Sequence, residues 1–348
     1  MISSDDIGSV ARQLTSRFVG FRWAEEDMRK LVGWLGWEWG REPGGRVGAV
    51  TGLPGGDAVV VPVGAAEREW APLQEYLELV VPVSRPALEP RAQAAEFRRA
   101  ADAVRRVLGD AAYCGAYGSA GPYGRPAEPS WGRPFMRWRE ERVTLELRAG
   151  TAGPELVLQP SDAWESWYAQ AGGGFVGVLE DTGHPLRHPH IERAGSWQQL
   201  ENALGAFLRT LPAETMATGM SQCVPLYGRV GDASPIMFGI ICDDRLYIDY
   251  CAYLVQEAAQ GENAAALGWT RRESLPPARI RASDDGKAPW RLDAGGPGQV
   301  PAAEVASLIV RTARAAGVRE ASELIIGGEG EYRRPYRIRF SGLAMATG

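Results

Sequence analysis

Few of the side chains on which metal and catalytic sites depend occur in this chain of 348 residues. It has three histidines, only two lysines and four cysteines. The cysteines are Cys114, Cys223, Cys242 and Cys251. They lie far apart without the C-x-x-C spacing of a zinc or redox motif, so we expect free buried thiols rather than zinc ligands or disulfides. No run of 18 consecutive apolar residues is present, and we therefore expect no transmembrane helix.

The chain also lacks an excess of basic residues. Lysine and arginine number 38 against 43 acids, which gives a formal net charge of -5 and a pI near 5.5. A nucleic acid or an anionic membrane surface is therefore not expected as a partner. The first residues, Met1 to Asp6, contain neither the basic nor the apolar region of a secretory signal, and we expect a cytoplasmic protein.

The three histidines fall within one short stretch. They are His184, His188 and His190, with Pro185 and Pro189 between them. The prolines prevent a helical arrangement of metal ligands, and no cysteine or aspartate completes a metal set, so a solvated linker is the favoured interpretation and a metal site a weak alternative. A Ser-His-Asp or Cys-His catalytic unit would have to use one of these histidines, which argues against a hydrolase.

No motif for a nucleotide cofactor is present. The glycine clusters at 172–174, 295–298 and 327–330 lack the lysine and the strand-to-helix placement of a phosphate-binding loop, so they are interpreted as turns and no cofactor is expected. Asp243 and Asp244 are expected to form a hairpin turn. Asp249 alternates with apolar residues, and we expect it to face solvent or an arginine rather than to act as a catalytic acid.

One motif that is present occurs twice: Leu35-Gly36-Trp37 and Leu267-Gly268-Trp269. In both places it ends a stretch with helical spacing. A glycine just past a helix adopts the left-handed conformation at little cost, and the apolar residue after it folds back onto the last turn. Each copy therefore predicts a helix, a stop, and a strand entered through a core tryptophan.

The order of helical and alternating segments predicts an α+β protein with two modules, each a mainly antiparallel sheet packed against helices. The modules are expected at 1–171 and 196–348, and 172–195 is expected to be a Gly/Pro/His linker. The stretch 115–134 is rich in glycine, proline and serine and is expected to be a loop. The main expected helices are 24–35, 92–108, 197–211 and 300–317, and a hairpin is expected at 135–139 and 143–148, whose second strand is expected to be half-buried.

Tryptophan is abundant, with twelve in the chain. Core packing accounts for most of them. Trp164, Trp167 and Tyr168 lie just before the expected linker, where a wholly interior position is least expected. Because tryptophan and tyrosine bury a large area with few rotatable bonds, these three are predicted to form an aromatic partner-binding surface. A contact between the modules is the alternative interpretation.

Leu267-Gly268-Trp269, Trp290 and the helix 305–312 carry a family likeness. The region 196–328 resembles the actinobacterial chaperone-like domains related to type III secretion chaperones and YbjN (TY-Chap). Phe21-Arg22-Trp23, Leu35-Gly36-Trp37 and the segment 138–147 look like an actinobacterial domain of unknown function. The resemblance implies helix-covered α+β sheets that bind a partner polypeptide, and it carries no active site. The strand 236–242 is more apolar than that pattern, which a buried central strand or a homodimer contact would explain.

These features together favour a non-enzymatic, chaperone-like or adaptor protein that binds a protein or peptide. Capture of an extended segment against a sheet face or edge is the expected mechanism. Two alternatives stay open at this point. One is an immunity protein that neutralises a cognate toxin, and the other is an enzyme of specialised metabolism on the same scaffold, which would need a deep pocket with several perturbed polar groups.

Overall fold

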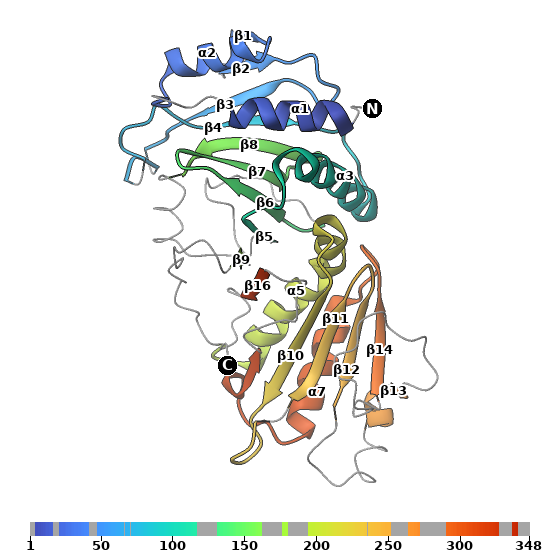
Figure 1. The fold of residues 1–348 in the computed structure, drawn as a ribbon. Coiled ribbons are helices and arrows are strands. Elements are labelled where there is room, and N and C mark those ends of the chain that lie inside the picture. Colours follow the sequence, from blue (N-terminus) through green and yellow to red (C-terminus); the bar gives the residue numbers. More distant parts are fainter. Residues whose placement is uncertain are drawn as a thin grey trace. The chain divides into compact units, whose positions relative to one another are not determined.

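The computed structural model divides the chain into two compact units, residues 1–173 with 181–189 and residues 174–180 with 190–348. Each unit is a mainly antiparallel sheet with helices packed against it, so the predicted α+β class is confirmed (Figure 1). The structure describes residues 4–16, 21–41, 47–65, 67–69, 71–116, 131–161, 176–179, 194–234, 236–251, 264–271, 290–326 and 336–339.

The first unit contains an antiparallel sheet in the order β1-β2-β3-β4-β8-β7-β6-β5. Its strands are β1 (Glu38–Arg41), β2 (Val47–Val50), β3 (Ala58–Pro62), β4 (Tyr76–Pro82), β5 (Tyr113–Ala116), β6 (Pro134–Arg139), β7 (Val143–Ala149) and β8 (Pro154–Pro160). The predicted β6–β7 hairpin is confirmed. The expected loop begins too early, because Gly115 and Ala116 belong to β5 and pair with β6. This short strand has no alternating apolar pattern that would reveal it.

Helices cover one face of this sheet (Figure 1). They are α1 (Ser4–Thr15), α2 (Glu25–Trp34) and α3 (Pro90–Leu108), and a 3-10 turn, η1, spans Glu67–Glu69. α1 and α3 pack against each other and against β7. Phe97 of α3 and Leu145 and Leu147 of β7 are fully buried between them. α2 lies instead against the terminal strand β1.

The second unit contains a sheet in the order β13-β14-β12-β11-β10-β15. Its strands are β10 (Gln222–Gly228), β11 (Ile236–Cys242), β12 (Leu246–Tyr250), β13 (Thr270–Arg271), β14 (Trp290–Gly295) and β15 (Leu324–Ile326), and a 3-10 turn, η4, spans Ala321–Glu323. Two helices, α5 (Trp197–Thr218) and α7 (Ala302–Ala315), pack against each other. β9 (Val176–Leu179) pairs with β16 (Tyr336–Arg339), so part of the expected linker is a strand.

Helix α5 is longer than the pattern predicts. It begins as expected at Ser196, whose hydroxyl accepts a hydrogen bond from the backbone N–H of Gln199 at 3.2 Å. It then continues past Leu211 and contains Pro212. Proline lacks the N–H of a helical hydrogen bond and costs about 3 kcal/mol in a helix interior. Burial of the following residues, including Ala213 and Ala217, offsets that cost.

The two Leu-Gly-Trp motifs end their helices with the same backbone hydrogen bonds. Gly36 and Gly268 have φ of 73° and 107°. The N–H of Trp37 donates to the carbonyl of Val32 at 3.0 Å, and that of Trp269 donates to Ala264 at 3.0 Å. This is the Schellman helix stop that the sequence predicts.

The side chains of the two motif tryptophans differ in burial. Trp269 is 4% exposed and stacks on Phe238 and Tyr250. Its indole N–H donates to the hydroxyl of Thr312 on α7 at 2.9 Å. Trp37 is only half-buried. The expectation of two core tryptophans is therefore correct for the second copy only, because no described residue stacks on Trp37 as Phe238 and Tyr250 stack on Trp269.

Candidate functional site

The residues predicted to form a site lie outside the described part of the chain. This holds for the aromatic residues Trp164, Trp167 and Tyr168. It holds equally for the histidines His184, His188 and His190. Among the residues that the structure describes, no three His, Cys, Asp or Glu side chains come together as a metal site would require.

The aspartates near β12 have structural roles. Asp243 stabilises the predicted hairpin turn, because its carboxylate accepts hydrogen bonds from the N–H groups of Asp244 and Arg245 at 2.6 and 3.1 Å. Asp249 is 1% exposed and accepts two hydrogen bonds from the guanidinium of Arg291, at 2.5 and 2.7 Å. It faces an arginine, one of the two expected surroundings, and both carboxylate oxygens are occupied.

Two of the four cysteines are buried thiols that resist ionisation. None of the four, all within the described residues, forms a disulfide; Cys114, Cys242 and Cys251 are buried, whereas Cys223 is half-buried. Burial raises the pKa of the Cys114 and Cys242 thiols far above the usual range. Because the thiolate is the nucleophilic form, these two thiols are inert in the folded protein.

The first sheet carries buried charges on its side opposite α1 and α3. Alternation along β7 places Leu145 and Leu147 toward the helices and Glu146 and Arg148 on the other side. Both sides of β7 are buried, so the expectation of a half-buried strand is wrong. Pairing of the charges makes this burial possible: Arg148 donates two hydrogen bonds to Glu78 of β4, at 3.0 and 3.2 Å.

A second ion pair lies beside it on the same side of the sheet. Arg137 of β6 is directly opposite Glu146 of β7 and donates a hydrogen bond to it, and both side chains are fully buried. Gln159 of β8 is also fully buried, and neither its amide N nor its amide O has a hydrogen-bond partner among the residues that the structure describes. The charges in this array neutralise one another, which is typical of a structural network.

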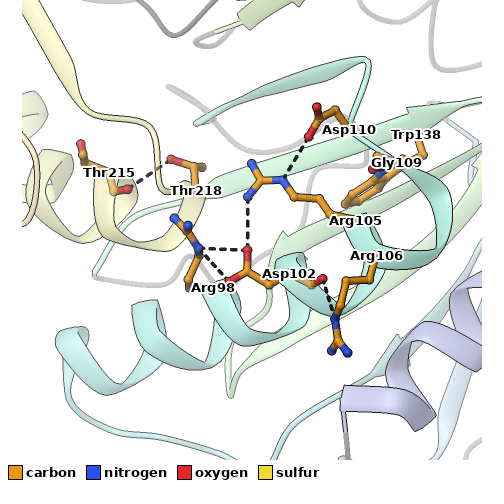
Figure 2. A network of polar contacts seen from close by, with 9 residues as sticks. All are labelled: Arg98, Asp102, Arg105, Arg106, Gly109, Asp110, Trp138, Thr215 and Thr218. Atoms are coloured by element: carbon orange, nitrogen blue, oxygen red, sulfur yellow. Dashed lines mark hydrogen bonds and ion pairs between the residues drawn. The ribbon is translucent and has the colours of Figure 1, made fainter.

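A third polar network lies on the outer surface of α3 (Figure 2). Asp102 accepts hydrogen bonds from Arg98 at 3.0 Å and from Arg105 at 3.4 Å. Where the helix ends, the indole N–H of Trp138 donates to the carbonyl of Gly109 at 2.9 Å and ties the helix to β6. Exposed ion pairs of this kind contribute little to stability. The Trp138–Gly109 hydrogen bond is the contact that fixes the end of the helix.

The remaining candidate surface surrounds strand β1, which in the described part of the chain is the terminal strand of its sheet. Trp34 at the end of α2 is 55% exposed, and Val50 of the neighbouring strand is 52% exposed. Trp37 is half-buried, and Glu38 and Asp57 are exposed. We call these five residues, together with the outer edge of β1, the edge patch.

The two sides of the edge patch differ in chemistry. Trp39 pairs with Ala49 and lies on the side of α2, where the guanidinium of Arg29 sits 4.9 Å from its ring centroid. Glu38 pairs with Val50 and lies on the opposite side. Asp57 precedes Ala58, the partner of Ala49, so continuation of that register places it beside Val50. The edge therefore has an aromatic side and an acidic side.

The sequence pattern did not identify this surface. Trp34 lies beside the apolar stripe of its helix, and its exposure depends on what covers the last helical turn, which the local pattern does not contain. The Arg137–Glu146 pair had a partial signal, because the predicted hairpin places the two residues on neighbouring strands and alternation places them on the same side. The observed register, in which the N–H of Glu140 donates to the carbonyl of Val143, brings them directly opposite one another. The Asp249–Arg291 pair had none, because 42 residues separate its members.

Comparisons with known protein families, curated proteins and solved structures find no match to this chain. The resemblance to chaperone-like domains accordingly stays a prediction. In the described part of the chain, none of the helices combines the length and the apolar character needed to cross a membrane.

Proposed function

We propose that this protein is a non-enzymatic, cytoplasmic binding protein, chaperone-like or adaptor in character, that captures a partner polypeptide as an added strand along β1. The observation that carries this proposal is the exposure of Trp34 and Val50 on either side of a terminal strand. A terminal strand presents backbone N–H and C=O groups that another extended chain can pair with. Pockets or side chains beside the edge then provide selectivity.

The composition of the edge patch supports protein recognition. Tryptophan is enriched at binding hot spots because it buries a large area at a small cost in side-chain entropy. Trp34 is the last residue of α2, and Trp37 follows the helix stop and directly precedes β1. An added segment that covers them would gain most of its affinity from these two anchors, with backbone hydrogen bonds fixing its register.

The polar clusters elsewhere in the described residues favour binding over catalysis. The carboxylates of Glu78 and Asp249 are engaged by arginines. The thiols of Cys114 and Cys242 have raised pKa values. A general acid, base or nucleophile must be accessible to its substrate, and these four groups are buried.

The proposal is tested by selecting peptides from a displayed library of random twelve-residue segments. We expect enrichment on the wild-type protein and its loss on a Trp34→Ala/Val50→Ser variant. Because both side chains are exposed, the variant should fold normally, which circular dichroism would verify. Leu73→Ala is the matched control, since Leu73 is 88% exposed and lies outside the edge patch. Equal enrichment on both variants, or no enrichment on folded wild-type protein, would overturn the proposal.

A further inference from the structure

We infer that the edge patch selects an amphipathic extended segment whose side chains are alternately apolar and basic. This inference rests on the proposed strand addition at β1. In an added strand, successive side chains point to opposite sides of the sheet. One set would lie beside Trp37 and Trp39, and the other beside Glu38.

The acidic side of the edge patch determines one half of this selectivity. Glu38 of β1, Val50 of β2 and Asp57, the residue before β3, form a row on this side, and all three are exposed. A residue of the added strand directly opposite Glu38 lies within reach of its carboxylate. A lysine or arginine there gains a cross-strand ion pair, whereas a glutamate or aspartate is repelled.

The aromatic side determines the other half. The nearby cations of α2 are already paired within the helix: Arg29 with Glu25 at 2.6 Å and Lys30 with Glu26 at 2.5 Å. The pairing with Lys30 lowers the pKa of Glu26. These charges cancel locally, so the side of α2 offers mainly the ring surfaces of Trp34 and Trp37. Apolar side chains of the added strand fit this surface.

A second copy of the chain fits the edge less well than a separate peptide. If two β1 edges paired about a two-fold axis, only Glu38 and Gly40 of the second copy would lie on the acidic side, because opposed residues share a face. No basic residue of that β1 would then oppose Glu38. Moreover, the four residues of β1 span only about 13 Å. Pairing of two such short edges would bury much less than the roughly 1,200–2,000 Å² of a stable interface between two protein chains.

The experiment measures binding of two labelled eight-residue peptides by fluorescence anisotropy at low ionic strength. One alternates valine and lysine, and the other alternates valine and glutamate. We expect the lysine peptide to bind wild-type protein about two- to fivefold more tightly, the factor expected from one exposed charge pair with Glu38. The Glu38→Lys/Asp57→Lys variant should reverse this preference. Glu140→Lys/Glu141→Lys is the matched control, because it changes the net charge equally at an exposed turn of the same unit.

Two further peptides separate strand addition from general attraction to a basic peptide. N-methylation of alternate residues removes the N–H groups along one edge of the peptide, and shifting the methyl groups by one residue removes those along the other. Only one of these two peptides should keep its affinity. A preference that both double variants change equally, or equal affinity of both methylated peptides, would overturn the inference and leave the proposed capture of polypeptides intact. If neither peptide binds and library selection also fails, the proposed function falls with it.

Discussion

The two Leu-Gly-Trp motifs have the same backbone and different side-chain surroundings. Both glycines have positive φ, and the backbone N–H of each tryptophan donates to the carbonyl five residues earlier at 3.0 Å. Trp269 is enclosed by Phe238, Tyr250 and α7, whereas Trp37 is half-buried beside the terminal strand β1. The same local motif therefore supports a core in one unit and borders a candidate binding surface in the other.

This difference shows that a helix stop determines the backbone position of the residue that follows it, but not the residues that its side chain contacts. The left-handed glycine is a local requirement and can be read from sequence. The partners of the following tryptophan come from residues far along the chain. Phe238 lies in β11, two strands before Trp269 in the sequence, and Thr312 follows Trp269 by 43 residues.

The largest expected loss of folding stability comes from removing the enclosed ring of Trp269. Trp269→Ala should destabilise the second unit by about 3–5 kcal/mol, because it leaves a cavity between β11, β12 and α7 and removes the partner of the Thr312 hydroxyl. Trp37→Ala should cost the first unit less, about 1–2 kcal/mol, because Trp37 is only partly buried. Hydrogen exchange of β11 and β2 amides would measure each unit separately. Similar losses in both variants would contradict the distinction.

A somewhat smaller effect is expected from the charge pair on the other side of β12. Arg291→Met should destabilise the second unit by about 3 kcal/mol, because it leaves the carboxylate of Asp249 buried without its counter-charge. The double variant Asp249→Leu/Arg291→Met should recover most of this loss. Arg245→Met is the matched control. In the pair that Arg245 forms with Asp293, the arginine side chain is 44% exposed and the aspartate side chain 26% exposed, so loss of the pair should cost less than about 1 kcal/mol. Urea denaturation of the variants checks the ranking.

The sequence predicted the parts of the fold that depend on local pattern. Apolar residues at helical spacing located α2 and α3, and strict alternation located β7. The short strands and the candidate site were not predicted. Short strands such as β5 and β15 have backbone pairing as their main support, and three or four residues carry too little pattern to reveal it.

The candidate site escaped for a different reason. Exposure of Trp34 depends on the absence of a covering element over the last turn of α2, which is a property of the tertiary arrangement. Burial of Glu78 depends on Arg148, 70 residues away. From local pattern alone, Trp34 would be assigned to the core and Glu78 to the surface. Their actual exposure depends on residues that are distant in the sequence.

A third prediction concerns the part that the two motifs share. Gly36→Ala and Gly268→Ala should each cost about 1–2 kcal/mol, because a Cβ is unfavourable at positive φ. At neither position would the added Cβ meet a heavy atom within 4 Å, so backbone strain is the only cost. The loss should be larger at Gly268, because its φ of 107° lies farther from the left-handed helical region than the 73° of Gly36. Asparagine, which tolerates this conformation, should cost less at both sites. Thermal or urea unfolding of the four variants would measure this, and a smaller loss at Gly268 than at Gly36 would contradict it.

The smallest expected effect is at a third helix stop of the same kind. Gly317 has φ of 102°, and the N–H of Val318 donates to the carbonyl of Ala313 at 3.1 Å. Beyond it, the carboxylate of Glu323 accepts hydrogen bonds from the N–H groups of Arg319 and Glu320, at 2.9 and 3.2 Å. These bonds hold the pKa of Glu323 below its ordinary value of 4.5.

Because the folded-state pKa of Glu323 is lowered, the carboxylate stabilises the fold above pH 4.5. That contribution disappears as the pH falls through the lower folded-state pKa, where the carboxyl group becomes protonated. Glu323→Gln should therefore lower stability slightly at neutral pH and have no effect at strongly acidic pH. A carbon-13 NMR titration of the Glu323 carboxyl group measures its pKa directly. A folded-state pKa at or above 4.5 would mean that the two N–H groups do not hold the carboxylate in solution, and that this third stop ends without the reinforcement that distinguishes it from the other two.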